Sequence, residues 1–463
     1  MSIFEALRAL DDREEPRTLR FHQTDMLLWP FVRWFVFAEA QQQALAQQPA
    51  FATNHRASLR DRGELLLRSQ LRGPLSVKRP FDIVAIESSV GQTLRREGRW
   101  FDRISDYFVM ELPERTLVLD RAHHGKYKRP RYPSHVRCWD TFDIRAGIRA
   151  RISRPLDRDV ASIDRLVSFV KTATPVTLSE SVLAHTRELL LHWAVRLPLL
   201  RDPLARFFDL VRPKVLFIED ASYGAFAHVC RWARAAGIAT AEFQHGVISR
   251  AHLAYNYGDR GGRELADHLP QYLLVYGELW AQQVRTPSEA VVVGCPHFSE
   301  STRAVRRESP GHVLTISQGI CTDAMVRITR ELAARHPTRR FVFRPHPGEL
   351  AFRERYASLE TIANVEVNTT GDLFEQLGRS ALVIGHSSTA LVEAAGMGAP
   401  VCVLDDEGSR SVLPAGLGTW FTSVDQVSSL LDTPASPSAS RTEFFADNWR
   451  ENYQSFIARV AAG

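Results

Sequence analysis

The sequence predicts an α/β protein of two domains, each built around a parallel sheet. Its 463 residues are too many for one hydrophobic core, since a domain usually holds about 100–200 residues. Short apolar runs alternate with segments of helical periodicity along most of the chain, a pattern typical of strands and helices in a parallel sheet. Hydrophobic residues make up 44% and charged residues 24% of the chain, as in ordinary globular proteins, so disorder is not expected.

Residues 1–75 are expected to form a helical extension in front of the first domain. Within it, the stretch from Met26 to Phe35 mixes apolar residues with Trp and Arg, a composition that also suits a membrane surface. The apolar run is too short to cross a bilayer, and we expect a helix packed on the first domain instead. The first residues lack the pattern of a signal peptide.

The first α/β domain is expected over residues 76–265. Its strands are predicted at 81–86, 116–119, 215–218 and 239–243. A helix over 222–236 connects the last two strands and makes a βαβ unit, which requires parallel pairing. Two helices, at 163–172 and 179–211, come before that unit. The basic and aromatic segment 121–137 is interpreted as a loop that is either solvated or in contact with an anionic acceptor.

The second α/β domain is expected over residues 266–435. Its strands are predicted at 272–276, 290–293, 312–316, 340–343, 365–367, 381–384 and 400–404, with helices between most of them. Residues 436–463 are rich in aromatic side chains, and we expect a final helix there that packs back onto the body of the protein.

The loop Arg344-Pro345-His346-Pro347 follows a predicted strand of the second domain. Ligands of doubly wound sheets bind at the carboxyl ends of the strands, so this loop stands where a site would form. The Arg344 guanidinium can hold a phosphate by two hydrogen bonds, and His346 can donate to a phosphate oxygen or supply a proton near neutral pH. A proline-stiffened turn with a chance histidine would explain the same residues.

A second loop, at residues 385–389, joins another strand to a helix and reads Gly-His-Ser-Ser-Thr. The free N–H groups and the dipole of a helix N-terminus favour an anion, and three hydroxyls add hydrogen-bond donors. Helix capping alone would also place serine and threonine here. Since the same sheet carries two loops suited to an anion, a phosphate site is the better interpretation. The expected ligands in this loop are His386, Ser387, Ser388 and Thr389.

Two further features of the second domain could line the same site. Glu393 lies four residues after Thr389 and shares its helix face, where a carboxylate could accept hydrogen bonds from ribose hydroxyls. Ser317-Gln318-Gly319 ends another predicted strand and forms a weaker signal of the same kind.

The first domain would supply an opposing wall. His245 and Gly246 follow the strand at 239–243, and the glycine allows close backbone approach. Glu219 and Asp220 end the preceding strand, where a carboxylate could remove a proton from an acceptor hydroxyl. Asp220 could equally be the N-cap of the helix that follows it.

These loops together resemble the GT-B glycosyltransferases, in which two Rossmann-like domains face each other across a cleft. The resemblance rests on Gln244-His245-Gly246, the Arg-Pro-His-Pro loop at 344–347 and the Gly-His-Ser-Ser-Thr loop at 385–389, in this order. More narrowly, they are similar to bacterial capsule and surface-polysaccharide transferases, namely Kdo transferases, sialyl- and polysialyltransferases, and CDP-glycerol glycerophosphotransferases. The resemblance covers residues 210–410.

The resemblance implies transfer of a sugar from a nucleotide-activated donor, with a CMP-sugar favoured, to a surface polysaccharide or a lipid-linked glycan. His346 and the hydroxyls of residues 387–389 would contact the donor phosphate, and Glu393 would lie near the nucleoside. Asp220 or Glu219 would act as base or nucleophile beside His245. No metal or other cofactor is needed in this picture, because arginine, histidine and helix N-termini neutralise the phosphate charge.

Three other functions fit the same motifs. One is a sugar-nucleotide 2-epimerase and another is glycerophosphate transfer, both on this fold. The third is a non-catalytic subunit that binds a nucleotide or a glycan in a polysaccharide assembly complex. Carboxylates opposite the phosphate site favour an enzyme, since a binding subunit has no need of them.

Net charge and cysteine content indicate the partners and the compartment of the protein. The net charge of +5 fits contact with phosphates or with an anionic membrane surface, and no nucleic-acid-binding motif is present. The five cysteines are scattered and form no metal or disulfide pattern, which favours the reducing cytoplasm. Peripheral contact with the cytoplasmic face of the inner membrane is a further expectation.

Overall fold

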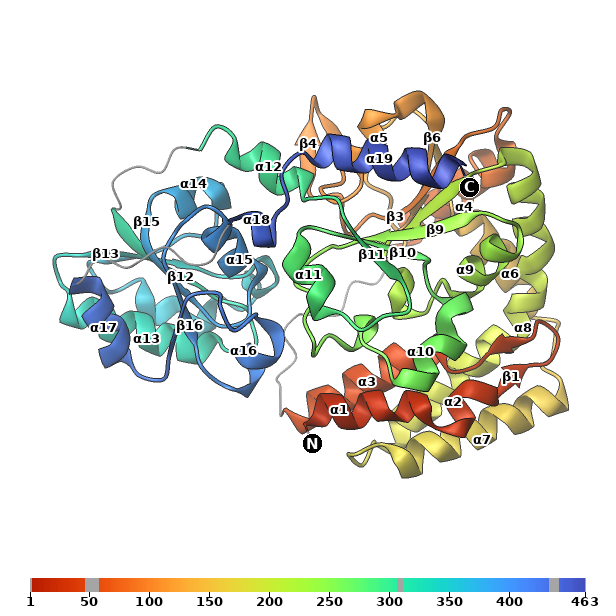
Figure 1. Ribbon diagram of the computed structural model, residues 1–463, viewed down its shortest axis with the longest axis horizontal. Coiled ribbons are helices and arrows are strands. Elements are labelled where there is room, and N and C mark those ends of the chain that lie inside the picture. Colours follow the sequence, from red (N-terminus) through yellow and green to blue (C-terminus); the bar gives the residue numbers. More distant parts are fainter. Residues whose placement is uncertain (1, 46–57, 306–310, 433–440, 463) are drawn as a thin grey trace.

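The computed structural model describes residues 2–45, 58–305, 311–432 and 441–462. Two parallel sheets, each covered by helices, lie beside each other (Figure 1). The C-terminal helix returns across the first domain, as predicted. The predicted GT-B class, with two Rossmann-like units, is therefore confirmed. Among the described residues, no helix is both long and apolar enough to span a bilayer.

The first sheet has seven parallel strands. Their bounds are β3 (Ile83–Ser88), β6 (Thr116–Arg121), β7 (Val136–Cys138), β8 (Val215–Ile218), β9 (Ala239–Phe243), β10 (Tyr272–Val275) and β11 (Glu289–Val292). They lie in the order β11-β10-β9-β8-β3-β6-β7. The central strands β3 and β8 are buried along their whole length, because helices cover both faces of the sheet.

The expected domain boundary at residues 265 and 266 is too early in the chain. Strands β10 and β11, which we assigned to the second domain, pair with β9 and extend the first sheet. An apolar strand of a parallel sheet carries no mark of the sheet to which it belongs, so the sequence could not assign it.

Within residues 58–305, the first domain contains seven helices from α5 to α11, of which four pack directly on the faces of its sheet. Their bounds are α5 (Asp106–Glu111), α6 (Asp140–Ala150), α7 (Asp157–Ala173), α8 (Glu180–Val211), α9 (Ala227–Ala235), α10 (Asp259–Leu265) and α11 (Glu278–Gln283). Helices α6, α8 and α9 share one core with the sheet, and α5 shares the core on the other face. A short hairpin of β4 (Leu94–Arg96) and β5 (Arg99–Phe101) precedes α5.

The N-terminal extension is helical, as predicted, with one short hairpin in it. It contains α1 (Ile3–Arg8), α2 (Glu14–Thr18), β1 (Arg20–Phe21), β2 (Met26–Leu27), α3 (Pro30–Ala44) and α4 (Leu59–Leu71). The stretch from Met26 to Val32 is buried against α7 and α8, which confirms packing on the first domain. The Arg33 guanidinium forms an ion pair with Asp11 at 2.8 Å and donates to the Asn256 carbonyl, which ties the extension to the domain.

The basic segment 121–137 is anchored to the first domain by buried ion pairs. Its Arg131 is buried and pairs with Glu87, Asp106 and Asp120, from three different parts of the first domain. The segment ends in strand β7. The segment is a loop up to β7, as predicted, but Arg131 is not solvated, because composition cannot distinguish an arginine that pairs with buried carboxylates from one that faces solvent.

The second sheet has six parallel strands in the order β14-β13-β12-β15-β16-β17. Their bounds are β12 (His312–Ile316), β13 (Arg340–Arg344), β14 (Val365–Val367), β15 (Ser380–Gly385), β16 (Val401–Leu404) and β17 (Thr419–Phe421). The helices are α13 (Thr322–Arg335), α14 (Leu373–Gly378), α15 (Thr389–Gly396), α16 (Glu407–Val412) and α17 (Val424–Asp432). Strand β12 separates β13 from β15, so the two predicted phosphate loops flank the loop at 317–319 and are not direct neighbours.

The chain passes between the domains twice. It leaves the first domain through α12 (Pro296–Thr302) and returns through α18 (Arg441–Phe444) and α19 (Trp449–Ala462). Aromatic residues of α19, including Trp449, Tyr453 and Phe456, pack under the first sheet against Phe217 and Phe243. The predicted boundary between residues 435 and 436 lies outside the described residues.

Candidate functional site

The carboxyl ends of the two sheets meet at one place, which we call the interdomain site. A Cβ atom placed on Gly246, after β9, would lie 3.7 Å from Thr389 Oγ1 at the start of α15. Nearby, the Ser249 hydroxyl donates to the Ser411 carbonyl at 2.7 Å across the two domains. The structure therefore brings the predicted first-domain wall against one of the predicted phosphate loops.

The N-terminus of α15 is suited to bind an anion, although the Ser388 hydroxyl already accepts a hydrogen bond as the helix cap. Ser388 is the N-cap, and its hydroxyl oxygen accepts from the Ala390 N–H at 3.2 Å. The capping interpretation is thus correct for Ser388. The half-buried Thr389 occupies the first turn, beside Gly246 of the other domain. An anion here would meet the positive end of the helix dipole.

His386 is held by a carboxylate that the sequence analysis missed. Its Nε2 lies 2.7 and 2.8 Å from the two carboxylate oxygens of Asp406, and its Nδ1 lies 2.9 Å from Ser387 Oγ. The carboxylate accepts from Nε2–H and so orients the ring. When Nδ1 is also protonated it donates to Ser387 Oγ, and the hydroxyl proton becomes available to a bound phosphate. The three residues therefore form one hydrogen-bonded chain at this strand end.

Glu349 joins the two other loops of this edge. Its fully buried carboxylate accepts from the His346 N–H at 2.8 Å and from the Ser317 hydroxyl at 3.0 Å, and it also contacts the Thr322 hydroxyl. The Ser317 hydroxyl is thereby committed within the protein. The predicted loop at 317–319 has a supporting role at its first residue, because Ser317 fixes the position of its neighbours.

His346 faces the interdomain site as a neutral ring. Its Nδ1 accepts from the Gly348 N–H at 3.1 Å, which places the ring proton on Nε2. Burial lowers the pKa of His346, and the charge of Arg103 from the first domain lowers it further.

In the adjacent loop, the Gln318 side-chain oxygen is buried without a partner among the described residues, and Gly319 adopts a positive φ of 83°. Of this loop, the Gln318 oxygen is therefore the group with hydrogen-bonding capacity left for a ligand.

The Arg344 side chain points to the loop before α14. Its guanidinium donates to Gln376 Oε1 at 2.9 Å and to the Gly371 carbonyl at 3.1 Å. These bonds hold the loop before α14, so the predicted phosphate contact from Arg344 finds no support in the geometry. The sequence placed Arg344 correctly at the end of β13 but could not say which way its side chain turns.

Glu393 is half-buried on α15. Burial raises its pKa to about 7, and the Arg103 charge opposes that rise. Its charge also acts on Tyr276 and Cys295, at the end of the first sheet. Glu393 therefore points to the junction of the domains, consistent with the predicted place beside a ligand.

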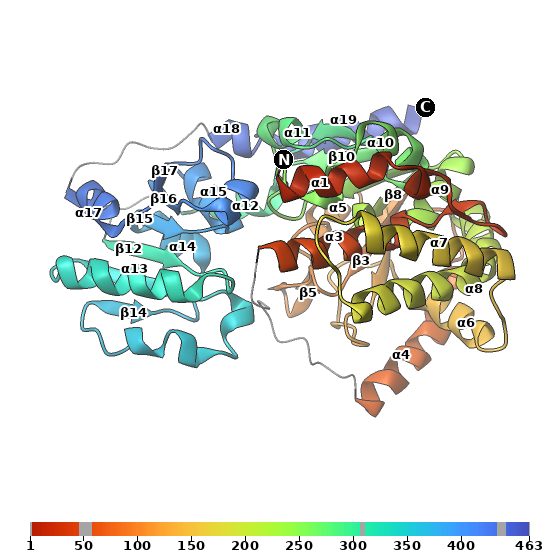
Figure 2. The same ribbon diagram turned by 90° about the horizontal axis from the view of Figure 1, so that it is seen from below.

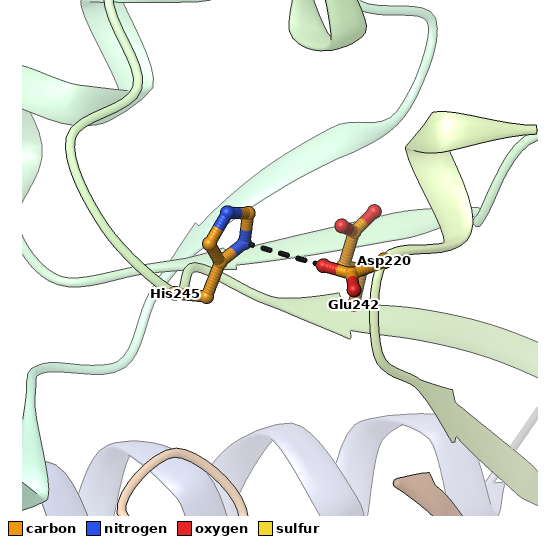
Figure 3. Close-up of side chains that lie close together, drawn as sticks. All are labelled: Asp220, Glu242 and His245. Carbon is orange, nitrogen blue, oxygen red and sulfur yellow. Dashed lines mark ion pairs between the residues drawn. The ribbon is translucent and has the colours of Figure 1, made fainter. Parts of the chain in front are cut away.

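The first-domain wall centres on Asp220, Glu242 and His245, at the ends of β8 and β9 (Figure 3). His245 Nδ1 lies 3.8 Å from Asp220 Oδ1. The Asp220 side chain caps no helix, and its backbone has a φ of 58°, which is uncommon for a residue other than glycine. Capping therefore does not explain Asp220. Its carboxylate is 44% exposed and available to a substrate.

Glu242 supports this wall from the interior. Its carboxyl oxygens accept from the Ser222 N–H at 2.9 Å and from the Tyr255 hydroxyl at 2.8 Å. Because Tyr255 donates to Glu242, its oxygen accepts from His245 Nδ1, 3.3 Å away. Burial raises the pKa of Glu242 to about 8 and lowers the pKa of His245. The result is a neutral, oriented imidazole beside an exposed carboxylate.

Three side chains of this wall could together bind a divalent cation. The ligand atoms of Asp220, Glu242 and His245 lie within 4.8 Å of one another. Both Glu242 oxygens, however, already accept hydrogen bonds from Ser222 and Tyr255, and hydroxyls face both ring nitrogens of His245. Protein donors thus account for the geometry, and the expectation that no metal is needed stays a prediction.

Glu219 is placed differently from Asp220. Its carboxylate is turned inward to the Ser88 N–H and belongs to a buried acidic group with Glu87 and Asp102. Burial, together with these neighbouring carboxylates and Asp220, raises the pKa of Glu219 well above its ordinary value. A protonated inward carboxyl is a poor base, so the geometry favours Asp220 over Glu219 for the predicted catalytic role.

Arg103 supplies the positive charge that Arg344 does not. It is exposed, and its guanidinium makes no hydrogen bond or ion pair within the part of the chain that the structure describes. Its charge acts on His245 in the first wall and on His346 and Glu393 in the second. Arg103 is therefore an exposed cation whose charge reaches groups of both walls.

Comparisons with known proteins agree with a glycosyltransferase-like second domain. Residues 321–453 match a family described as "Putative glycosyltransferase (DUF6716)". The match includes the loops at His346 and His386 together with Glu349 and Asp406, and none of the first-domain wall. No curated protein matches the chain.

Solved structures resemble the chain only distantly. UDP-GlcNAc 2-epimerase from Neisseria meningitidis, bound to UDP-GlcNAc, has 13% identity and a TM-score of 0.47, over 82% of this chain and 100% of that one. The S. aureus MnaA–UDP structure has 11% identity and a TM-score of 0.46, over 84% and 98%. A structure titled as the glycotransferase of kitacinnamycin has 12% identity and a TM-score of 0.40, over 83% and 98%. These likenesses are too distant to carry an activity over to this chain.

The role of Asp406 can be tested by removing its charge and keeping its shape. Asp406→Asn retains the cap of α16 and an oxygen for His386, but it removes the negative charge beside the ring. We expect the affinity for CMP, measured by calorimetry, to fall by roughly tenfold. Asp405→Asn, which alters the neighbouring pair with Arg410, should bind like the wild type. Equal affinity of both variants would remove Asp406 and His386 from the site.

The raised pKa of Glu242 predicts a pH dependence of stability. Because its pKa is raised in the folded protein, it stabilises the fold at low pH, and that stabilisation is lost as the pH rises towards about 8. The free energy of unfolding in urea should therefore decline less between pH 5.5 and 8.5 in Glu242→Gln than in the wild type. The exposed Glu278→Gln serves as the control. Parallel curves for wild type and Glu242→Gln would show that Glu242 is already ionised at pH 5.5.

Proposed function

We propose that this protein is a glycosyltransferase that moves a sugar from a nucleotide-activated donor to a glycan acceptor at the interdomain site. The observation that carries the proposal is the contact between Gly246 and Thr389. It sets a wall of acid–base groups against a helix N-terminus suited to phosphate. Residues 321–453, which include that helix, belong to a glycosyltransferase-like sequence family, and this supports the same assignment.

In the proposed complex, the donor phosphate lies at the start of α15. The Thr389 hydroxyl, the helix N–H groups and Ser387 donate to it, and the His386–Asp406 pair stabilises its charge. Arg103 approaches from the opposite wall. As the bond from sugar to phosphate breaks, negative charge grows on the leaving phosphate, so these donors bind the transition state more strongly than the ground state.

The acceptor hydroxyl would be activated by Asp220. An exposed carboxylate held beside His245 can accept a proton from a hydroxyl group, while the neutral imidazole is kept in place by Tyr255. In a retaining reaction the same carboxylate would instead attack the sugar. Glu393, protonated in part near neutral pH, is placed to bind a ribose or sugar hydroxyl.

A CMP-sugar remains the favoured donor, on the resemblance of the loops at residues 344–347 and 385–389 to sialyl- and polysialyltransferases. The favoured acceptors are a surface polysaccharide or a lipid-linked glycan, handled in the cytoplasm with peripheral contact at the membrane. The second candidate is a sugar-nucleotide 2-epimerase. Asp220 and His245 suit an epimerase as well as a transferase, because proton removal from a sugar carbon needs the same groups as proton removal from a hydroxyl.

Nucleotide release from a panel of CMP-, CDP-, UDP- and GDP-sugars separates these activities. We expect release that depends on an added membrane extract as acceptor, and that is the same with a chelator as with added Mg²⁺. Asp220→Asn should lower the rate about 10²–10⁴-fold and leave nucleotide affinity unchanged. Asp209→Asn, at the far end of α8, is the matched control.

The other outcomes each contradict part of the proposal. Conversion of the nucleotide sugar without an acceptor would identify an epimerase. Tight nucleotide binding with no turnover would identify a binding subunit. Loss of activity on chelation would place a divalent cation at Asp220, Glu242 and His245.

A further inference from the structure

Two neighbouring helices of the first domain expose large aliphatic side chains to solvent. Leu66, Leu67 and Leu71 of α4 have 49%, 61% and 69% of their surface exposed. Ile148 of α6 and Ile152 after it have 56% and 91% exposed. Nine large hydrophobic side chains are exposed among the described residues, and these five gather on one pair of helices. Such a concentration indicates an interaction surface.

The two helices are in contact, and we call their exposed surface the α4–α6 face. The Thr141 hydroxyl of α6 donates to the Ser69 carbonyl of α4 at 2.6 Å, and Arg145 donates to Gln70 at 3.2 Å. The buried Ser69 turns towards the body, so the leucines turn outward. Figure 2 shows α4 extending away from the first domain beside α6. The face therefore protrudes.

The same face carries unneutralised positive charge. Its exposed arginines without an ion pair, within residues 58–305, are Arg60, Arg62, Arg72, Arg145, Arg149, Arg151 and Arg154. Its outward carboxylates, Asp61 and Glu64, are already paired with Lys126 and Arg68. A partner of this face must therefore be negatively charged as well as apolar.

A pocket of ≈ 260 Å³ opens between α6 and α8 at the edge of this face. Three arginines (Arg145, Arg149 and Arg206) and one carboxylate, Asp202, line it, with an apolar floor that includes Phe142 and Leu199. Guanidinium groups bind phosphate oxygens in pairs, and the floor suits the glycerol and acyl carbons next to a phosphate. The pocket thus fits the headgroup of an anionic phospholipid.

We propose that the α4–α6 face docks the protein on an anionic lipid bilayer. The leucines and isoleucines enter the interface, and the arginines bind headgroup phosphates. A folded apolar partner would leave the arginines unpaired, whereas an anionic bilayer satisfies both kinds of side chain. The stretch from Met26 to Val32 cannot serve this purpose because it is buried. The proposal locates the membrane contact of the proposed function, and it is tested by binding alone, without the reaction.

Co-sedimentation of the full chain with lipid vesicles tests the proposal. We expect binding to vesicles of phosphatidylcholine mixed with phosphatidylglycerol, weaker binding at high salt, and little binding to phosphatidylcholine alone. The double variant Leu67→Gln, Leu71→Gln should lower the partition coefficient by roughly tenfold. Arg149→Gln and Arg151→Gln should each lower it by roughly fivefold. Leu210→Gln and Arg327→Gln, elsewhere on the surface, should match the wild type.

Three results would overturn the proposal. One is no binding to either vesicle, and another is binding that the α4–α6 variants leave unchanged. The third is a wild-type dimer, detected by light scattering, that the leucine variant converts to a monomer, because the face would then be an interface between two copies. Nucleotide binding by the same variants should stay unchanged, so a failure here is distinguishable from a failure of the proposed transferase site.

Discussion

The relation between the two domains depends on one tightly packed crossing of the chain. Residues 441–449 pass from the second domain back to the first through contacts that only glycine permits. A Cβ atom on Gly294, whose φ is 94°, would lie 2.8 Å from the Ala446 carbonyl oxygen, and one on Gly396 would lie 2.8 Å from the Phe445 ring. Phe445 stacks on Phe298 with ring centroids 3.9 Å apart. This crossing holds the carboxyl ends of the two sheets against each other.

The second domain contributes the groups suited to phosphate, and the first domain contributes the acid–base groups. The second domain offers a helix N-terminus and the His386–Asp406 pair, which suit a phosphate, but it turns its Arg344 elsewhere. The first domain offers Asp220 beside an oriented His245, together with Arg103. Transfer between two bound molecules requires such a division, because the leaving phosphate and the attacking group lie on opposite sides of the reacting carbon.

Much of this arrangement follows from one rule that the sequence reveals, namely that polar residues after buried strands gather at one edge of a parallel sheet. The rule correctly placed Asp220, His245 and His386, and it would also have found Asp406, which follows β16. Glu242 carried a different signal, since a charged residue within an apolar strand must have partners inside the fold.

Other features could not be predicted from local sequence. The direction of the Arg344 side chain depends on the loop before α14, which is remote in the chain. The burial of Arg131 depends on three carboxylates from distant segments, and the membership of β10 in the first sheet depends on its pairing with β9. Arg103 follows a hairpin with no motif of its own. Each of these is a tertiary contact that the local pattern does not encode.

The central claim is that phosphate binds at the start of α15, facing Asp220. A crystal structure with bound CMP tests it most directly. The account predicts a phosphate within hydrogen-bond distance of Thr389 and Ser387, with Arg103 turned towards it from the first domain. A nucleotide bound elsewhere, with the start of α15 in contact only with Gly246 and solvent, would contradict it.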